Sequence, residues 1–542
     1  MKSNILKILA AVSGIAVLLA FSAKLFTPVW YSWNHDNTVK GIYKEPENRI
    51  QVLFLGSSKV VNAISPITLY NEYGMCSYNM GTEKQRYLAS YYWLREIYTR
   101  HSKTLKVVVL DISPLFEECD EAFDEKALVH MKFSSNKIEA YRAMEELYDN
   151  YSFMDHFFPV AAYHSRWADI TGDDFQKFDR NSNQFYTRGQ HLDFTTVLYA
   201  DTLSRIFIPN NDFSEIHDYT AEELESVWDV NNREYLYKIA EFCRDRGLSL
   251  VLTGLVRPAI DDLENESINY LSRKLGVPYI NTNLPEIQKE IGLDFAYDFV
   301  DHGSHVNVFG AEKISRYIGA FLKTSYEIED IRGQEDYAYL DKMAGEFKKI
   351  DAIIALRNCG DLDEYLDLLN GGNYSVFLSV MGEYADNLSE DQRKALDGLG
   401  FHRISEAVSG SSYVGLTDQR MTVVDEIGIF PGKGAAAIGM REDGVWTLSG
   451  ILNPYVRNDN YSVPGGFFLT SLGAEPDSYS SIRIFEKDYS IGKRGLNFAV
   501  YDNDFNTVVD RSCFDSHLPD APKMDYGLYD QYLLQLNKVG KE

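Results

Sequence analysis

The sequence predicts an α/β protein in which a doubly wound, three-layer parallel sheet is followed by a second domain rich in β-strands. Between residues 45 and 325, short apolar runs alternate with longer amphipathic stretches, which is typical of βαβ units. Across residues 338–542, helical stretches give way to successive apolar runs separated by Gly, Asn and Asp turns. The length of 542 residues also exceeds what one hydrophobic core normally supports.

The N-terminal residues 1–31 have the composition of a signal anchor. Lys2 and Lys7 precede an uncharged run of sixteen residues, and Trp30 and Tyr31 are residue types that favour a membrane interface. We expect an uncleaved transmembrane helix here, with a cleaved signal peptide as the alternative. Because positive charge precedes the apolar run, the expected location is the cell membrane, single-pass, with the C-terminal bulk extracytoplasmic.

In the α/β region, short apolar runs that end in turn residues predict strands at 51–55, 106–110, 248–253 and 278–280. Apolar residues at helical spacing predict helices at 84–101, 135–148, 222–246, 261–275 and 307–323. The stretch between 150 and 220 is aromatic and irregular, and we interpret it as an insertion that covers the site.

In the C-terminal region, the same criteria predict strands at 374–380, 412–416, 421–428, 435–440, 445–451, 465–471, 481–486 and 496–502. A short helix is expected at 389–399, because Ser389 is a good N-cap and acidic residues follow it.

Composition excludes several classes of function. The formal net charge of −27 argues against nucleic-acid binding, since phosphate recognition needs clustered Lys and Arg. Five scattered cysteines include no C-x-x-C pair, so neither a disulfide framework nor a zinc site is supported. We therefore expect no metal and no other cofactor.

The end of the first predicted strand offers a serine nucleophile. The stretch from Gln51 to Lys59 is an apolar run followed by a tight Gly-Ser-Ser turn. In an open parallel sheet, residues just beyond the carboxyl ends of the strands form the ligand crevice. We identify Ser58 as the candidate nucleophile and Ser57 as the alternative. Asp111, at the end of the next predicted strand, lines the same crevice or caps a turn.

A second cluster precedes the last predicted helix of the α/β region. A serine becomes an effective nucleophile when an imidazole, oriented by a carboxylate, removes its proton. His305 is the candidate base and Asp301 would orient it, since both lie in one short loop; His302 is an alternative base. Each motif alone is common in non-catalytic proteins. Their placement at the first βα turn and before the last helix, which converge in a doubly wound sheet, favours a Ser-His-Asp relay.

Stabilisation of an oxyanion needs fixed hydrogen-bond donors. The N–H groups of Ser58 and Gly81 are the candidate donors, because Gly81 lies between the first strand and the long helix that follows. Asn79 offers a side-chain amide, although an Asn in a turn more often bonds its own backbone.

These motifs resemble the SGNH (GDSL-like) hydrolase superfamily, and within it the membrane-anchored DltD-like and AlgJ/AlgX-like proteins of cell-surface polysaccharide O-acylation. Gly56-Ser57-Ser58 stands where the superfamily has Gly-Asp-Ser, Gly81 resembles the glycine of the second block, and Asp301 and His305 resemble the final block. The family spacing is Asp-x-x-His, one residue shorter than here. The resemblance implies a flavodoxin-like α/β/α sandwich over about residues 45–325.

The second domain shows a fainter resemblance. The blocks Tyr374-Ser-Val-Phe-Leu-Ser-Val and Arg494-Gly-Leu-Asn-Phe-Ala-Val-Tyr-Asp502 are similar to those of ILEI/PANDER-type domains, although in permuted order. This resemblance implies an accessory role in carbohydrate binding for residues 338–542.

Together these features predict an extracytoplasmic serine acyltransferase or esterase that acts on O-acyl groups, O-acetyl or D-alanyl, of a cell-surface polysaccharide. Its expected partners are that polymer or a teichoic-acid-like one, a membrane-bound O-acyltransferase that supplies acyl groups, and the membrane through the N-terminal helix. The rival hypothesis is a non-catalytic cell-surface glycan-binding or assembly protein with a degenerate SGNH fold. In that case, Ser58, His305 and Asp301 would lie beyond hydrogen-bond reach of one another.

Overall fold

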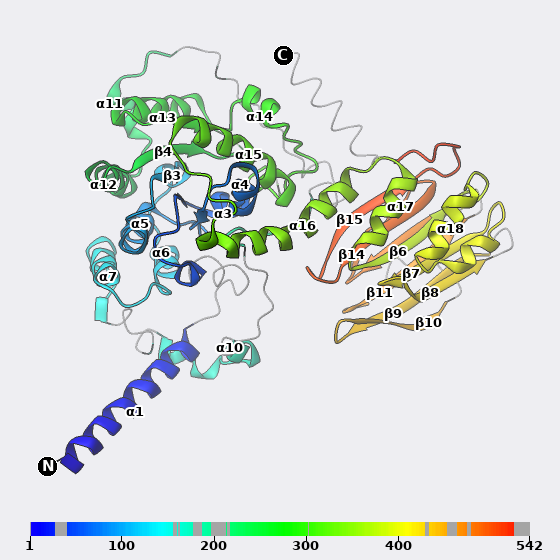
Figure 1. Ribbon diagram of the computed structural model, residues 1–542, viewed down its shortest axis with the longest axis horizontal. Helices are drawn as coiled ribbons and strands as arrows, with labels where there is room; N and C mark the ends of the chain where they lie inside the picture. The colour runs from blue at the N-terminus through cyan, green and yellow to red at the C-terminus, as the bar shows by residue number, and fades with distance from the viewer. Residues whose placement is uncertain are drawn as a thin grey trace. The chain divides into compact units, whose positions relative to one another are not determined.

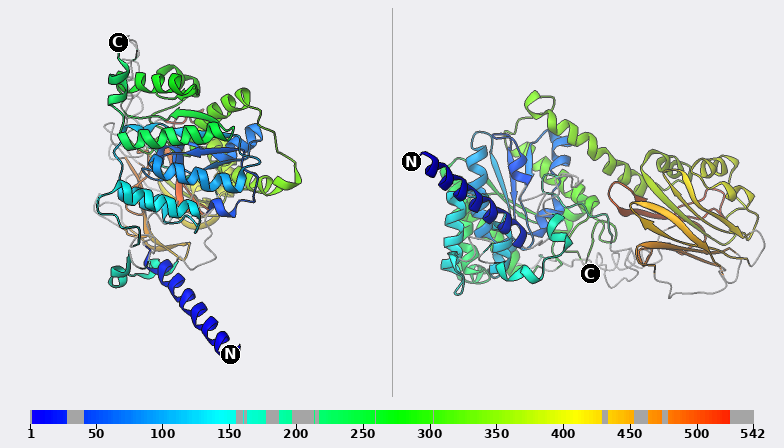
Figure 2. Two further views of the ribbon diagram at one scale, coloured as in Figure 1. Left: turned by 90° about the vertical axis from the view of Figure 1, so that its left-hand side faces the viewer. Right: turned by 90° about the horizontal axis from the view of Figure 1, so that it is seen from below.

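The computed structural model describes residues 2–27, 41–154, 160, 163–176, 187–196, 213, 217–258, 260–301, 303–428, 433–452, 463–473 and 478–524. The chain divides into two compact units. The first unit comprises Met1–Asp193 and Phe207–Ala344, and the second comprises Phe194–Ile206 and Gly345–Glu542. Figures 1 and 2 show the elements of each unit.

A five-stranded parallel sheet forms the centre of the first unit (Figure 1). Its strands are β1 (Val52–Leu55), β2 (Ser77–Asn79), β3 (Val107–Asp111), β4 (Ser249–Gly254) and β5 (Tyr279–Asn281). They lie in the order β2-β1-β3-β4-β5, and every neighbouring pair is parallel. This order reverses direction between β1 and β3, which is where doubly wound sheets bind their ligands.

Helices connect these strands. In the described part of the first unit, the α-helices after the N-terminal one are α3 (Ser58–Ala63), α4 (Pro66–Tyr73), α5 (Tyr87–His101), α6 (Glu121–Leu128), α7 (Ser135–Leu147), α10 (Gly172–Gln176), α11 (Ala221–Ser226), α12 (Val230–Asp245), α13 (Asp262–Leu275), α14 (Pro285–Ile291) and α15 (Val308–Ser325). Short 3-10 turns are η1 (Gly41–Lys44), η2 (Ser113–Phe116), η3 (His164–Ala168) and η6 (Glu335–Tyr337). Helix α16 (Ala338–Asn358) begins in the first unit and ends in the second.

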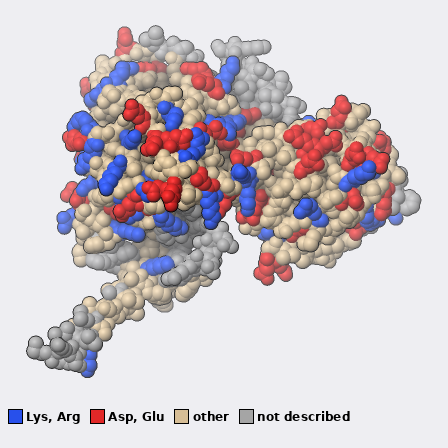
Figure 3. All heavy atoms as spheres, viewed as in Figure 1, with Lys and Arg blue, Asp and Glu red and all other residues tan. Residues whose placement is uncertain are grey.

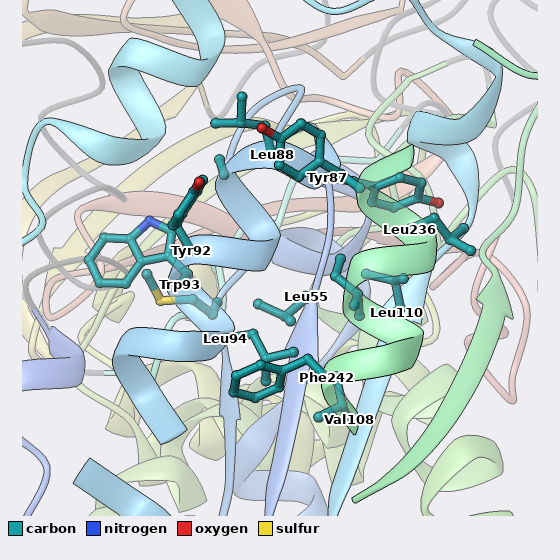
Figure 4. Close-up of a cluster of buried hydrophobic side chains, with 14 of the residues drawn as sticks. Leu55, Tyr87, Leu88, Tyr92, Trp93, Leu94, Val108, Leu110, Leu236 and Phe242 are labelled. Atoms are coloured by element: carbon teal, nitrogen blue, oxygen red, sulfur yellow. The ribbon is translucent and has the colours of Figure 1, made fainter. Parts of the chain in front are cut away.

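The two faces of the sheet are covered by different helices. Alternate strand residues such as Leu55, Val108 and Leu110 belong to one buried cluster with side chains of α5 and α12 (Figure 4). On the opposite face lie α3, α4 and α15 (Figure 1), and α15 packs so closely on α4 that a Cβ at Gly319 would be 2.4 Å from the ring of Tyr73. The result is a three-layer α/β/α arrangement.

The four strands predicted in this region are confirmed to within one residue at each end. The helix predicted at 222–246 is wrong in one respect, because it is two helices, α11 and α12. The chain breaks between them because the side chain of Asp229 accepts a hydrogen bond from the N–H of Asn232 and begins α12 as its N-cap.

The prediction of an N-terminal transmembrane helix is wrong for this structure. Helix α1 (Lys2–Phe26) does form, but no helix in the described part of the chain is long and apolar enough to span a membrane. The lysine-free run of sixteen residues between Lys7 and Lys24 gives the physical reason. At 1.5 Å per residue it extends about 24 Å, whereas the hydrocarbon core of a bilayer is about 30 Å thick.

The second unit contains two five-stranded sheets. The first has the order β15-β14-β6-β7-β8, with β6 (Tyr374–Met381), β7 (Ser412–Asp418), β8 (Met421–Gly428), β14 (Gly495–Asp502) and β15 (Thr507–Phe514). The second has the order β10-β9-β11-β12-β13, with β9 (Ala435–Glu442), β10 (Val445–Ile451), β11 (Gly466–Leu472), β12 (Tyr479–Ile484) and β13 (Lys487–Asp488). Side chains from both sheets form one buried cluster that includes Phe377, Trp446 and Phe467.

Helices α17 (Leu362–Gly371) and α18 (Glu390–Gly398) and the 3-10 turn η7 (His402–Glu406) complete the second unit. Ser389 caps α18 as predicted, because its hydroxyl accepts from the N–H of Gln392 in a capping box. The prediction of a β-rich C-terminal region is confirmed, although α16, α17, β13 and β15 had no predicted counterpart.

A buried carboxyl in α6 predicts how the stability of the first unit depends on pH. Oδ2 of Asp124 accepts a hydrogen bond from Tyr148 at 2.7 Å, whereas Oδ1 has no partner among the described residues. Burial raises the pKa of Asp124 to about 7 from its usual 3.8. Between these values the folded chain holds a proton that the unfolded chain has lost, so this group makes the protein less stable as pH rises through that range.

We therefore expect Asp124→Asn, which cannot ionise, to be more stable than the wild type by about 1–3 kcal/mol at pH 8. The advantage should shrink on going to pH 5, where the wild-type carboxyl is protonated. Urea unfolding at both pH values measures the difference. An advantage of equal size at the two pH values would contradict the assignment.

Candidate active site

The turn after β1 fixes the position of the candidate nucleophile. Gly56 has φ of +152°, and a Cβ there would lie 2.4 Å from the Cβ of Asp111, so only glycine fits. Ser57 is the N-cap of α3, and its hydroxyl accepts from the N–H of Lys59 at 3.3 Å. Ser58 is therefore the first residue of α3, at the carboxyl end of β1, which pairs with both β2 and β3.

Asp111, at the end of β3, holds this turn in place. It is completely buried, and its Oδ2 accepts from the Ser57 hydroxyl at 2.7 Å. Its Oδ1 accepts from the N–H and the hydroxyl of Ser113 at 3.1 and 2.9 Å. The two alternatives for Asp111 are thereby resolved, since it caps the turn after β3 and also binds the turn after β1. Because the Ser57 hydroxyl is used by Asp111, Ser58 is the better placed of the two serines.

The loop before α15 holds the candidate base. Oδ1 of Asp301 accepts from the N–H groups of Ser304 and His305, both at 2.9 Å. Gly303, at φ of +79°, allows the chain to turn between Asp301 and Ser304, and its N–H donates to the Asp301 carbonyl at 2.7 Å. Asn307 then caps α15 by accepting from two N–H groups of its first turn, so the helix begins within one residue of its predicted start. The loop therefore folds around the Asp301 carboxylate.

The structure brings the three predicted catalytic side chains together. Ser58 Oγ lies 2.8 Å from His305 Nε2, and His305 Nδ1 lies 2.6 Å from Asp301 Oδ2. A carboxylate can only accept, so Nδ1 carries a hydrogen, and in the neutral ring Nε2 then presents a lone pair to the serine hydroxyl. The side chains of His305 and Asp301 are 32% and 35% exposed, which leaves the relay accessible from solvent.

The electrostatics of Asp301 suit this arrangement. Burial acts to raise the pKa of Asp301, but the hydrogen bonds from the His305 ring and from the N–H groups of His305 and Ser304 outweigh it. The pKa of the carboxyl is therefore lowered, and the group is ionised at neutral pH. An ionised carboxylate stabilises the imidazolium that forms when His305 takes a proton.

The three predicted oxyanion donors differ in whether their N–H groups are already used in hydrogen bonds. The N–H of Ser58 belongs to the first turn of α3 and forms none of that helix's own hydrogen bonds. The N–H of Gly81 donates to Asn79 Oδ1 at 3.1 Å. The Asn79 amide donates to the carbonyls of Val60 and Ile64 at 2.7 and 2.9 Å, which uses both of its hydrogens. Asn79 thus joins β2 to α3 and has no hydrogen left for an oxyanion.

Part of the predicted insertion lies against the site. The N–H of His191 donates to Val61 O at 2.9 Å, and Asp193 O accepts from the N–H of Val308, the first residue of α15, at 2.8 Å. The segment 187–193 therefore spans from the nucleophile helix to the base helix. The alternative base His302 and most of 155–186 and 197–216 lie outside the described residues.

Three polar residues of the site were not predicted. Nδ2 of Asn62 donates to Ser58 O at 2.7 Å, and Asn62 Oδ1 accepts from His191 Nδ1, 2.9 Å away. Burial and, to a smaller extent, nearby His305 lower the pKa of His191 to about 4 against the opposing effect of Asp193, so its ring is neutral at pH 7. The third is Lys59. Its place beside Ser58 was the only signal in the sequence, whereas nothing pointed to His191.

The chain matches no family model and no curated protein. The resemblance to SGNH hydrolases and the fainter one to ILEI/PANDER-type domains therefore stay predictions that rest on the quoted motifs.

An ion pair anchors the segment 187–193 to the first unit. Arg188 and Glu45 are each 1% exposed, and Arg188 Nη1 lies 2.7 Å from Glu45 Oε2. Arg188 Nε also donates to Ser77 O at 2.9 Å, and its own carbonyl accepts from the N–H of Asn79 at 3.0 Å. The cation thus fixes this segment to β2, next to the site.

We expect Arg188→Met to destabilise the protein by about 3–5 kcal/mol, because it leaves a buried carboxylate without its cation. Denaturant unfolding measures the change. The double variant Arg188→Met/Glu45→Gln removes the unpaired charge, so it should recover part of the loss. A double variant less stable than Arg188→Met would show that the ion pair is not the cause.

Proposed function

We propose that this protein is a serine-dependent acyl-transfer enzyme, an esterase or O-acyltransferase. The observation that carries the proposal is the continuous relay from Ser58 through His305 to Asp301, with distances of 2.8 and 2.6 Å. A degenerate, non-catalytic site has no reason to keep these contacts, and their presence at the switch point of the sheet supports the catalytic hypothesis over the binding one.

The chemistry follows from the geometry. Ser58 Oγ attacks the carbonyl carbon of an ester while its proton passes to His305 Nε2, and the imidazolium is stabilised by Asp301. The tetrahedral intermediate collapses as the C–O bond to the leaving alcohol breaks, and His305 returns the proton to that alcohol. Water or a sugar hydroxyl then attacks the acyl-enzyme with the same proton transfers in reverse. Hydrolysis and transfer differ only in this acceptor.

The substrate is proposed on the resemblance alone. O-acyl groups, O-acetyl or D-alanyl, on a cell-surface polysaccharide or teichoic-acid-like polymer fit the family that the motifs resemble, and so does a membrane-bound O-acyltransferase as acyl donor. The surface adds one constraint, since acidic and basic side chains are interspersed over the visible face of the described first unit (Figure 3) in a chain of net charge −27. Strongly anionic polymers would be repelled by this net charge, so an uncharged polysaccharide fits the protein better than a teichoic-acid-like polymer does.

Covalent labelling with a fluorophosphonate probe tests the proposal. We expect the wild type to be labelled at Ser58, as located by mass spectrometry, and Ser58→Ala to remain unlabelled. His305→Ala and Asp301→Asn should label at least 100-fold more slowly, because the serine loses its base or the base loses its orientation. A folded wild type that takes no label would refute the proposal.

The second unit supplies a matched control. Its His402 Nδ1 lies 2.8 Å from Asp397 Oδ1, so this exposed pair has the same two side chains as the proposed site. His402→Ala should label at the wild-type rate. A decrease equal to that of His305→Ala would mean that the effect is not specific to the relay.

A further inference from the structure

A lysine next to the nucleophile joins three segments of the site. Lys59 is the second residue of α3, directly after Ser58. Its Nζ donates to Val256 O at 3.1 Å, in the loop after β4, and to Ser304 O at 3.2 Å, in the loop of the proposed base. One side chain therefore ties the nucleophile turn to two other loops at the carboxyl edge of the sheet.

The peptide group between Ser304 and His305 is hydrogen-bonded on both sides. The carbonyl of Ser304 accepts from Lys59, and the N–H of His305, in the same peptide group, donates to Asp301 Oδ1 at 2.9 Å. The orientation of this peptide sets where the His305 side chain begins. Lys59 thus links the backbone of His305 directly to the helix that carries Ser58.

Charged groups from several elements surround Lys59. Asp111 at the end of β3, Asp301 in the base loop and Glu117 after η2 attract its ammonium, whereas Arg257 after β4 repels it. Burial has the largest effect, and the pKa of Lys59 is lowered to about 8 from its usual 10.5. The side chain is therefore charged at neutral pH and loses its proton in mildly alkaline solution.

We propose that protonated Lys59 is a positioning residue for acyl transfer, which holds His305 within hydrogen-bond distance of Ser58 through the Ser304 carbonyl. This inference rests on the serine chemistry proposed above. An ammonium binds a carbonyl more strongly than a neutral amine does. Loss of the proton therefore loosens the base loop and slows the reaction.

The loss of the Lys59 proton cannot slow the reaction at alkaline pH by unfolding the protein. Since folding lowers the pKa of Lys59 from 10.5 to about 8, the unfolded chain binds more protons than the folded chain between these pH values. This group therefore makes the protein more stable as pH rises through that window. A decline in rate that accompanies unchanged or increased stability is a signature that a merely structural lysine would not give.

The test is the rate of fluorophosphonate labelling of Ser58 in the full chain between pH 6 and 10, with thermal unfolding followed on the same samples. The wild-type rate should decline above about pH 8. We expect Lys59→Met to label about 10- to 100-fold more slowly at pH 7, without the alkaline decline. Lys59→Arg keeps a permanent charge, so it should label faster than Lys59→Met and also lack the decline.

Lys137 in α7 is the matched control. It is buried, its Nζ donates to the carbonyls of Val129 and Met131, both at 2.9 Å, and burial lowers its pKa to about 8 as well. Lys137→Met should alter stability but keep the wild-type labelling rate and its pH dependence.

The outcomes separate the two proposals. If Lys59→Met labels at the wild-type rate, or keeps the same alkaline decline, the positioning role is refuted while the serine chemistry stands. If Lys137→Met reproduces the effects of Lys59→Met, the positioning role is likewise refuted. If the folded wild type takes no label at Ser58, the proposed function itself fails.

Discussion

The close contact between the ends of β1 and β3 is the constraint on which the site depends. Gly56 lies so near Asp111 that a Cβ there would be 2.4 Å from the Asp111 Cβ, and the buried Asp111 carboxylate binds the hydroxyl of Ser57. A buried carboxylate is tolerated only when its oxygens are paired. Hydrogen bonds from the turn after β1 and from the turn after β3 provide this pairing, so neither turn can shift without exposing an unpaired charge. Ser58, the first residue of α3, is consequently held in a fixed position between β1 and β3, where the strand order of the sheet reverses.

Much of the first unit could be predicted from the sequence because its longer elements carry a clear period. The helices at 84–101, 261–275 and 307–323 extend over several turns, so each has an apolar face that can be recognised. Two of the missed elements are short: β2 has three residues and α3 has six, too few to establish any period. The anchor prediction failed because the run between Lys7 and Lys24 is too short to cross the hydrocarbon core, although the flanking lysines and the residues Trp30 and Tyr31 suit an anchor.

The residues of the site also differ in whether they could be predicted from the sequence. Ser58, Asp301 and His305 could be identified because each stands at a chain position that the topology of a doubly wound sheet brings to one edge. The hydrogen-bond partners of Asn79 and Lys59 could not be predicted, because they depend on which carbonyls come within 3.2 Å after folding. Likewise, β14 pairs along its whole length with β6, although more than a hundred residues separate them. Because β6 and β14 are neighbours in the sheet, the two strands can pair in this way whichever of them comes first along the chain.

The spacing of Asp301 and His305 shows how local folding simplifies the geometry of the site. Three residues separate them, one more than in the family that the motifs resemble, yet the turn at Gly303 closes the pair to 2.6 Å. Among the described residues, the hydrogen bonds that orient Asp301 toward His305 come from this loop itself, so the base and its carboxylate form one local unit. What remains to be controlled is the distance from that local unit to Ser58, across 247 residues of chain. The segment 187–193 joins α3 to the start of α15 through Val61 and Val308, and Lys59 adds a direct tie from α3 to the base loop itself. Lys59 is thus placed to act on the proton-transfer distance.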